Sequence, residues 1–126
     1  MPIEVHEHDD FVEFVGTGDL SADEIISVSS TYHANSPRKL ALWNFLGARV
    51  SSFRAANFQR VAMKGSDLAN LRGLGARNAI VVSIPSERQL LQAYSNMASA
   101  VSPVEHEIFC GREEAIAWLK SSNNGI

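Results

Sequence analysis

The sequence has few cysteines, which could form disulfides, and no cluster of basic residues, which could bind nucleic acid. Its single cysteine, Cys110, excludes an internal disulfide and indicates a reducing compartment. Eleven Lys and Arg residues stand against fourteen Asp and Glu, the formal net charge is −3, and the basic residues are scattered. Because nucleic acids are bound through clustered positive charge, we expect no nucleic-acid partner.

Long apolar runs are also missing. No stretch approaches the length of a membrane span, and the start of the chain has no basic segment followed by an apolar one. We therefore expect a cytoplasmic protein with no membrane insertion.

What the sequence does contain is enough apolar material for a core. Hydrophobic residues make up 45% and charged residues 20% of the 126 residues, which is ordinary globular composition. A chain of this length buries about two thirds of its extended surface on folding. We expect residues 1–126 to form a single domain.

The first residues predict a β-hairpin. Two runs within residues 3–16 alternate between apolar and polar side chains, and they flank two aspartates at positions 9–10. Aspartate carboxylates bond nearby backbone N–H groups and so favour a turn. Residues 16–20 are interpreted as a connector that leads to the first helix.

Signals for the start and end of that helix follow. Ser21 and Glu24 have the capping-box spacing, in which each side chain satisfies a free backbone N–H of the first turn. Pro37 is expected to end the helix, because proline cannot continue its hydrogen bonds. His33, near the end of the helix, is interpreted as a charge that favours the helix C-terminus.

The middle of the chain predicts a buried strand and a second helix. Residues 40–45 form a nearly continuous apolar run, which is typical of a strand covered on both faces. Residues 47–53 are interpreted as a loop. A helix is expected from residue 55 to about 72, with Gly65 weakening its middle enough to break it there.

The next apolar run is the clearest strand of the chain. Residues 78–84 are predicted to form the central strand of the sheet, and Pro85 is expected to stop it. Ser86 and Gln89 repeat the capping-box spacing at the start of a third helix.

A final strand and helix complete the order. Residues 104–109 predict the strand, and Gly111 precedes a helix in which Trp118 is assigned to the buried face. The chain thus reads as an α/β fold of order β-β-α-β-α-β-α-β-α. Alternation of this kind implies a mostly parallel five-stranded sheet with four helices, and residues 3–8 supply one antiparallel edge strand.

Three stretches carry a resemblance to a known family. They are residues 14–21 (a strand, a glycine and a helix start), residues 76–82 (an apolar strand) and residues 108–119 (a Phe, two acidic residues, then Ala and Trp-Leu). Together they resemble the STAS-like, or SpoIIAA-like, group of small bacterial proteins, which share the fold of anti-sigma-factor antagonists. The resemblance implies a non-catalytic interaction or regulatory module.

The sequence departs from the family at its phosphorylation motif. In antagonists, a phosphorylatable serine follows an aspartate at the start of the second helix, and the preceding strand ends in aspartate. Here Asn44 stands at the strand position, and Val50 precedes Ser51 and Ser52. The chain therefore resembles the family without its usual Asp-Ser motif.

Two clusters are candidates for a chemical site. His6 and His8 fall on one face of a strand, as metal ligands would, but no further ligand cluster lies nearby, and we interpret them as a solvated edge. Cys110 shares a face with His106, yet a small apolar residue at a strand end is the commoner reason for such a cysteine. No metal, cofactor or catalytic residue is expected.

The best candidate for a binding site is the carboxyl end of the predicted parallel sheet, where open α/β sheets bind ligands. Residues 44–54 and residues 83–87 both leave strands there. The first segment carries the apolar residues Leu46, Val50 and Phe53. Arg49 and Arg54 flank them, a combination that interfaces favour. The candidate ligand- or partner-binding residues are Trp43, Asn44, Arg49, Ser51, Ser52, Phe53, Arg54, Ser83 and Ser86.

Alternatives remain for several of these residues. Val50 and Phe53 have a second interpretation, in which they fold back and cap the core. Trp43 either belongs to the core or lines a cavity between sheet and helices. Ser83 and Ser86 either cap the third helix or contact a ligand.

Two functions remain open at this point. The first is a non-catalytic interaction module that binds a protein partner or forms a homodimer. The second is a carrier that holds a small apolar or lipid-like ligand between sheet and helices. No nucleophile, base and electrophile come together in the sequence, so an enzyme is not expected.

Overall fold

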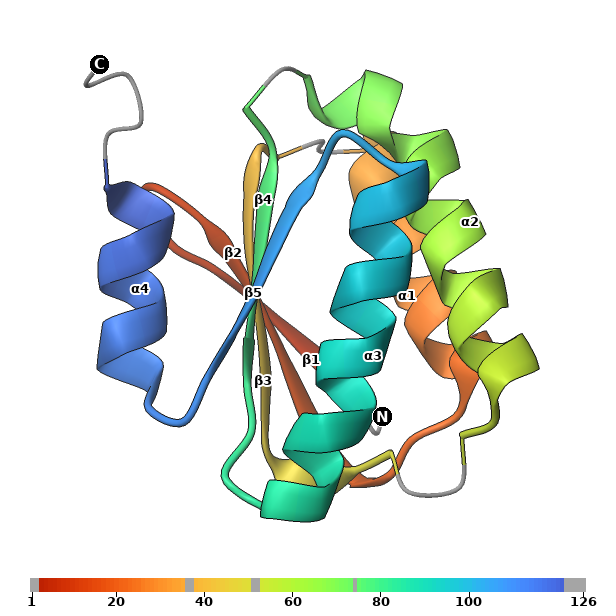
Figure 1. Ribbon diagram of the computed structural model, residues 1–126. Coiled ribbons are helices and arrows are strands. Elements are labelled where there is room, and N and C mark those ends of the chain that lie inside the picture. Colours follow the sequence, from red (N-terminus) through yellow and green to blue (C-terminus); the bar gives the residue numbers. More distant parts are fainter. Residues whose placement is uncertain (1–2, 36–37, 51–52, 74, 122–126) are drawn as a thin grey trace.

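The computed structural model describes residues 3–35, 38–50, 53–73 and 75–121. Within these ranges the chain forms five strands and four helices in the predicted order (Figure 1). The strands are β1 (Ile3–Glu7), β2 (Val12–Asp19), β3 (Leu40–Arg49), β4 (Arg77–Val81) and β5 (Glu105–Phe109). The helices are α1 (Ala22–Asn35), α2 (Ala55–Arg72), α3 (Pro85–Val101) and α4 (Arg112–Lys120). None of these helices is both long and apolar enough to cross a membrane.

All five strands join one sheet in the order β1-β2-β3-β4-β5. β1 pairs antiparallel with β2, and every other neighbouring pair is parallel, which confirms the predicted mixed sheet with an antiparallel edge. The middle strand is β3, however, so the prediction that residues 78–84 are central is wrong. Because the strands follow chain order, β4 lies one place off the centre, and its long apolar run reflects cover on both faces.

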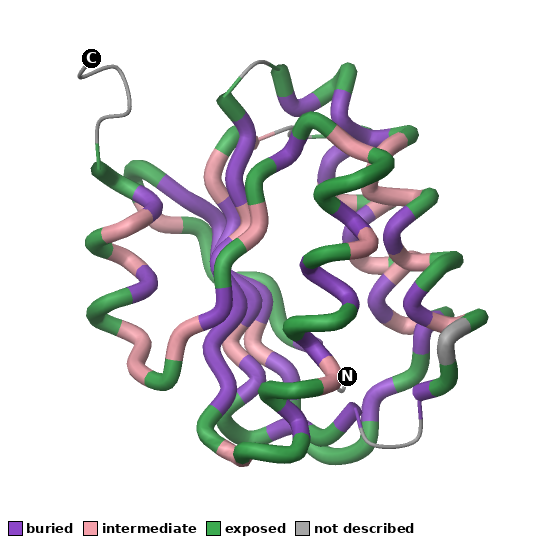
Figure 2. The backbone as a smooth tube through the Cα atoms, viewed as in Figure 1, coloured by how far each residue is buried: buried purple, intermediate pink, exposed green. Residues whose placement is uncertain are grey.

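The helices cover the two faces of the sheet unequally. α1, α2 and α3 lie over one face and α4 lies alone over the other (Figure 1). Figure 2 shows the buried chain concentrated in the strands and on the inward sides of the helices. The larger apolar cluster fills the space under the three helices, and a smaller one, built around Leu42, Val81 and Leu119, lies under α4.

The first helix begins as its sequence predicts. The Ser21 backbone N–H donates to Glu24 Oε1 at 2.8 Å, and the Glu24 N–H donates to Ser21 Oγ at 3.1 Å, which confirms the capping box. The third helix begins differently. Pro85 is its first residue, where a missing N–H costs nothing, so Ser86 lies inside the helix and does not cap it.

Two segments interpreted as irregular belong to the sheet. β2 continues to Asp19 and β3 continues to Arg49. Both strands therefore end later than predicted, and they include most of the expected connector at residues 16–20 and the first part of the expected loop at residues 47–53. The cause is a bulge in their pairing. Between the Val15–Asn44 and Thr17–Gly47 pairs, β2 advances by two residues and β3 by three.

Close packing favours a glycine on β2 opposite the bulge. A Cβ on Gly16 would lie 2.9 Å from the Leu20 side chain and 3.2 Å from that of Phe45. Beyond the bulge, Ala48 and Val50 turn toward the face covered by the three helices. The bulge therefore returns the end of β3 to the core.

Two further expectations change at the helices. α2 runs through Gly65 without a break. In α4, Ala115 and Leu119 are buried, but Trp118, which was predicted to be buried, is only partly so. Its ring packs beside Phe109 with centroids 5.8 Å apart, and the Arg77 guanidinium lies 4.9 Å from its centre.

Candidate functional site

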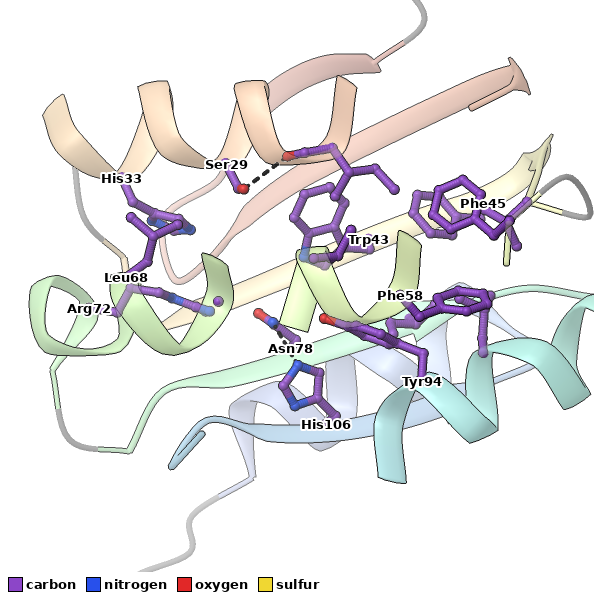
Figure 3. A pocket seen from close by; sticks show the side chains of 17 residues that line it. Ser29, His33, Trp43, Phe45, Phe58, Leu68, Arg72, Asn78, Tyr94 and His106 are labelled. Atoms are coloured by element: carbon purple, nitrogen blue, oxygen red, sulfur yellow. Dashed lines mark hydrogen bonds between the residues drawn. The ribbon is translucent and has the colours of Figure 1, made fainter. Parts of the chain in front are cut away.

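A cavity of about 60 Å³ lies between the sheet and the three helices on its larger side (Figure 3). Side chains from β3, β4 and β5 form its floor, and side chains from α1, α2 and α3 form its walls. A cavity of this size has room for roughly four to six water-sized groups. It is therefore suited to a small ligand.

One end of the cavity is apolar and aromatic. Phe45 and Val50 come from the end of β3, and Phe53 precedes α2. The Phe53 and Phe58 rings pack 5.1 Å apart, and Leu91 of α3 closes this end. These residues belong to the main core, so this end of the cavity is continuous with it.

The other end is polar, because helices end and strands begin there. His33 lies in the last turn of α1 and Arg72 ends α2, while Asn78 and His106 are the second residues of β4 and β5. Tyr94 of α3 lines the cavity near them, and burial raises the pKa of its hydroxyl to about 12. Figure 3 shows His33 and Arg72 at the opposite end from Phe45 and Phe58.

Asn78 and His106 form a hydrogen-bonded pair with an assigned direction. His106 Nδ1 lies 3.0 Å from the Val104 carbonyl oxygen, which can only accept, so Nδ1 carries the proton. His106 Nε2 then accepts from the Asn78 amide nitrogen at 3.2 Å. This leaves Asn78 Oδ1 buried and without a hydrogen-bond partner within the described ranges.

Both histidines of the cavity are neutral near pH 7. Burial lowers the pKa of His106 to about 4, and burial together with the Arg72 charge lowers the pKa of His33 to about 4. His33 Nδ1 accepts from the Arg38 backbone N–H at 3.4 Å. The prediction that His33 supplies a charge to the helix C-terminus is therefore wrong, because the side chain points into the core.

Arg72 is a buried cation held by backbone. Its Nε donates to the Arg38 carbonyl at 2.9 Å, and Nη2 donates to the carbonyls of Lys39 and Arg77 at 2.9 and 3.1 Å. Burial lowers its pKa to about 10, so the guanidinium remains charged at neutral pH. Within the described ranges no carboxylate lies at ion-pair distance from it.

A second buried charge lies on the opposite face of the sheet, under α4. Glu13 is 4% exposed and accepts two hydrogen bonds from Arg112, at 2.7 and 2.9 Å. Asn44 Nδ2 donates to it at 3.0 Å, and His8 Nε2 lies 2.9 Å from its other oxygen. The bonds from Arg112 lower the pKa of Glu13 to about 2 despite its burial.

No protein-family model matches the chain, and no curated protein matches it by sequence. An anti-sigma factor antagonist from Mycobacterium paratuberculosis matches by structure, with a TM-score of 0.69 and 12% identity over 94% of this chain and 93% of that one. The chain has a SpoIIAA-like fold.

Two further structures share this SpoIIAA-like fold. The anti-sigma factor antagonist SpoIIAA in its unphosphorylated form matches with a TM-score of 0.57 and 16% identity, over 95% of this chain and 99% of that one. An uncharacterised protein from Shewanella loihica, described as having a SpoIIAA-like fold, matches with a TM-score of 0.54 and 17% identity over 93% and 91%. The likeness that the sequence motifs indicated is thus confirmed for the fold.

Within the SpoIIAA-like fold, the predicted site residues separate into two groups. Trp43 and Phe53 line the cavity, and Phe53 and Val50, 6% and 1% exposed, pack into the core. Asn44 is on the other face of the sheet, where it bonds Glu13. Ser51 and Ser52 lie outside the described residues.

The second group lies at the carboxyl end of the sheet. Arg49, Arg54, Ser83 and Ser86 are all exposed there. A hydrogen bond joins the two segments that carry them: the Val50 N–H donates to the buried carboxylate of Glu87 at 2.5 Å. This contact bears out the expectation that the ends of β3 and β4 meet at one edge.

The two weaker chemical candidates are not assembled. His6 lies 3.2 Å from Glu4, and His8 bonds Glu13; within the described ranges no three metal-ligating side chains come together. Cys110 is exposed, whereas His106 is engaged by Asn78 and Val104.

Sequence reasoning missed the polar end of the cavity. Its residues come from five different helices and strands, and each is ordinary in its own segment. One usable signal was present: Asn78 and His106 are polar residues near the starts of two strands, in positions that face the same side of a parallel sheet.

Proposed function

We propose that this protein is a non-catalytic regulatory module that binds a protein partner through the carboxyl end of its sheet. The observation that carries the proposal is the structural likeness to an anti-sigma factor antagonist over 94% of the chain. Such a protein, by its name, acts against another protein. Residues 1–126 serve here as one interaction domain.

The binding surface that we propose combines exposed arginines with small polar residues. It consists of Leu46, Arg49, Arg54, Ser83, Ser86 and Arg88, all exposed and all near the carboxyl ends of β3 and β4. Leu46 is 44% exposed and supplies an apolar contact. Since the whole chain has a formal net charge of −3, three arginines at one end favour a partner with an acidic patch.

The test places a photo-crosslinking amino acid at Ser83 in the full chain, in cells, with Gln92 on the exposed side of α3 as the control position. We expect a protein crosslinked from position 83 and not from position 92. Arg49→Glu should then weaken that complex by tenfold or more, on the order of 1.4 kcal/mol. Lys39→Glu, an equal charge change just before the opposite end of β3, should leave it intact.

A second copy of this chain crosslinked from position 83 would also support the surface. No product from position 83, or equal products from both positions, would overturn the proposal. So would a partner lost equally with Arg49→Glu and Lys39→Glu. Neither substitution should shift the melting temperature by more than a degree or two, because both side chains are exposed.

The cavity supports a second candidate function, that of a carrier for a small ligand. An apolar cavity with a few convergent polar groups is the usual form of a small-molecule site. The two functions are compatible, because Val50 and Phe53 line the cavity directly beneath the proposed binding surface.

A further inference from the structure

The cavity is chemically asymmetric, and its asymmetry limits what can occupy it. Phenylalanine side chains surround one end, and Arg72, Asn78 and two neutral histidines surround the other (Figure 3). No Asp or Glu lines it, so Arg72 is the one charged residue among its lining residues. An occupant must therefore be apolar at one end and complementary to a cation at the other.

The helix that carries Arg72 leaves space for such an occupant. Val61, Gly65, Leu68 and Arg72 of α2 follow helical spacing and all line the cavity. A Cβ at Gly65 would meet no atom within 4 Å. Glycine costs a helix interior about 1 kcal/mol relative to alanine, so this open space is maintained at the expense of stability.

The polar end holds groups that the described residues do not satisfy. Three backbone carbonyls accept hydrogen bonds from Nε and Nη2 of Arg72. Its Nη1 has no hydrogen-bond partner within the described ranges. Asn78 Oδ1 is a buried acceptor that also lacks a partner there. An unpaired buried acceptor such as Asn78 Oδ1 costs about 1–3 kcal/mol. Nη1 of the Arg72 guanidinium favours an anionic acceptor, and Asn78 Oδ1 favours a hydrogen-bond donor.

We propose that the cavity binds a small carboxylic acid with a short apolar body and one hydroxyl group. The carboxylate accepts from Arg72, the hydroxyl donates to Asn78 Oδ1, and the apolar body lies toward Phe45 and Phe58. This inference rests on the carrier function and names the class of its ligand. The two histidines are neutral at pH 7, so the carboxylate is drawn to Arg72.

The experiment uses 2-hydroxyisovalerate as the probe and measures binding to the full chain by isothermal titration calorimetry. The neutral 2-hydroxyisovaleramide should bind roughly tenfold or more weakly, because the charge-assisted bond to Arg72 is lost. Isovalerate, which lacks the hydroxyl, should bind severalfold more weakly. Equal binding of acid and amide would overturn the carboxylate assignment and leave an apolar carrier.

Variants locate the binding within the cavity. Gly65→Leu places a side chain into the open space and strengthens the helix, so it should fold and lose binding. Asn70→Leu adds the same side chain on the exposed side of α2 and should bind as the native protein does. Unchanged binding by Gly65→Leu would overturn the proposed site. Absence of binding by all three compounds to the native chain would overturn both the ligand and the carrier function.

Discussion

Phe53 shows how the surroundings of one residue decide its role. In the sequence it stands beside Arg54 in a segment that looks like an exposed interface loop. In the structure the bulge opposite Gly16 keeps β3 in register with the core, and Phe53 packs on Phe58 and lines the cavity. Its neighbour Arg54 is exposed. Of these two adjacent residues, Phe53 therefore packs in the core and Arg54 lies on the surface.

The two roles predict opposite results for two alanine substitutions. Phe53→Ala should lower the free energy of unfolding by about 3–5 kcal/mol, as large aromatic truncations in cores do. Arg54→Ala should change it by less than about 0.5 kcal/mol, because the side chain is exposed. Urea denaturation of both variants measures the difference. A loss below about 1 kcal/mol for Phe53→Ala would contradict the packing seen here.

Residue patterns predicted the regular parts of the fold and missed what depends on distant neighbours. Capping at Ser21, the run at residues 78–84 and the alternation in the first hairpin are local signals, so the order of elements followed from them. The continuation of β3 to Arg49 could not be predicted in this way, because a bulge interrupts the alternation of inward and outward side chains along the strand. Arg72 and Asn78 come to line one cavity only when the helices cover the sheet, and no local sequence pattern records that arrangement.

At the scale of elements, α4 depends on two arginines. It has nine residues and covers its face of the sheet alone. Arg112, its first residue, bonds the buried carboxylate of Glu13, and Arg77 of β4 donates to the Trp118 carbonyl at 2.6 Å near its other end. Both ends of the helix are therefore fixed to the sheet by charged side chains.

Removing one partner of the Glu13–Arg112 pair should be costly. Arg112→Met leaves a buried carboxylate with weaker partners and should lower the free energy of unfolding by about 2–4 kcal/mol. The double variant with Glu13→Gln should lose less than the sum of the two single losses. Thermal and urea unfolding of the four proteins measures this. Lys120→Met, which breaks an exposed pair with Asp10, is the control and should cost under about 0.5 kcal/mol.

The molecule as a whole should lose stability in mild acid. His33 and His106 have native pKa values of about 4, below the ordinary value of 6.5, so the unfolded chain takes up protons that the native protein does not. The stabilisation is complete above pH 6.5 and is lost as the pH falls toward 4. Each histidine should contribute a loss of about 2–3 kcal/mol. Below pH 4.5 the protonation of Glu13, with its pKa of about 2, adds to the loss.

Urea unfolding at a series of pH values between 7 and 4 measures this dependence. His33→Gln should flatten the curve between pH 6.5 and 4, even where it lowers stability at pH 7. His6→Gln, at an exposed edge position, should leave the shape unchanged. A native protein whose free energy of unfolding is constant from pH 7 to 5 would contradict the neutral burial of both histidines.

The order of the strands also bears on how the molecule forms. Each strand after β1 pairs with the strand that precedes it in the chain. Each pairing therefore closes a loop no longer than one connection, and its entropic cost stays small. The bond from Arg112 to Glu13 is different, because it joins residues 99 positions apart. It cannot form until α4 has emerged and docked. In a nascent chain that has not yet reached residue 112, Glu13 lacks the cation that it pairs with in the native protein, and docking of α4 is the step that covers the second face of the sheet.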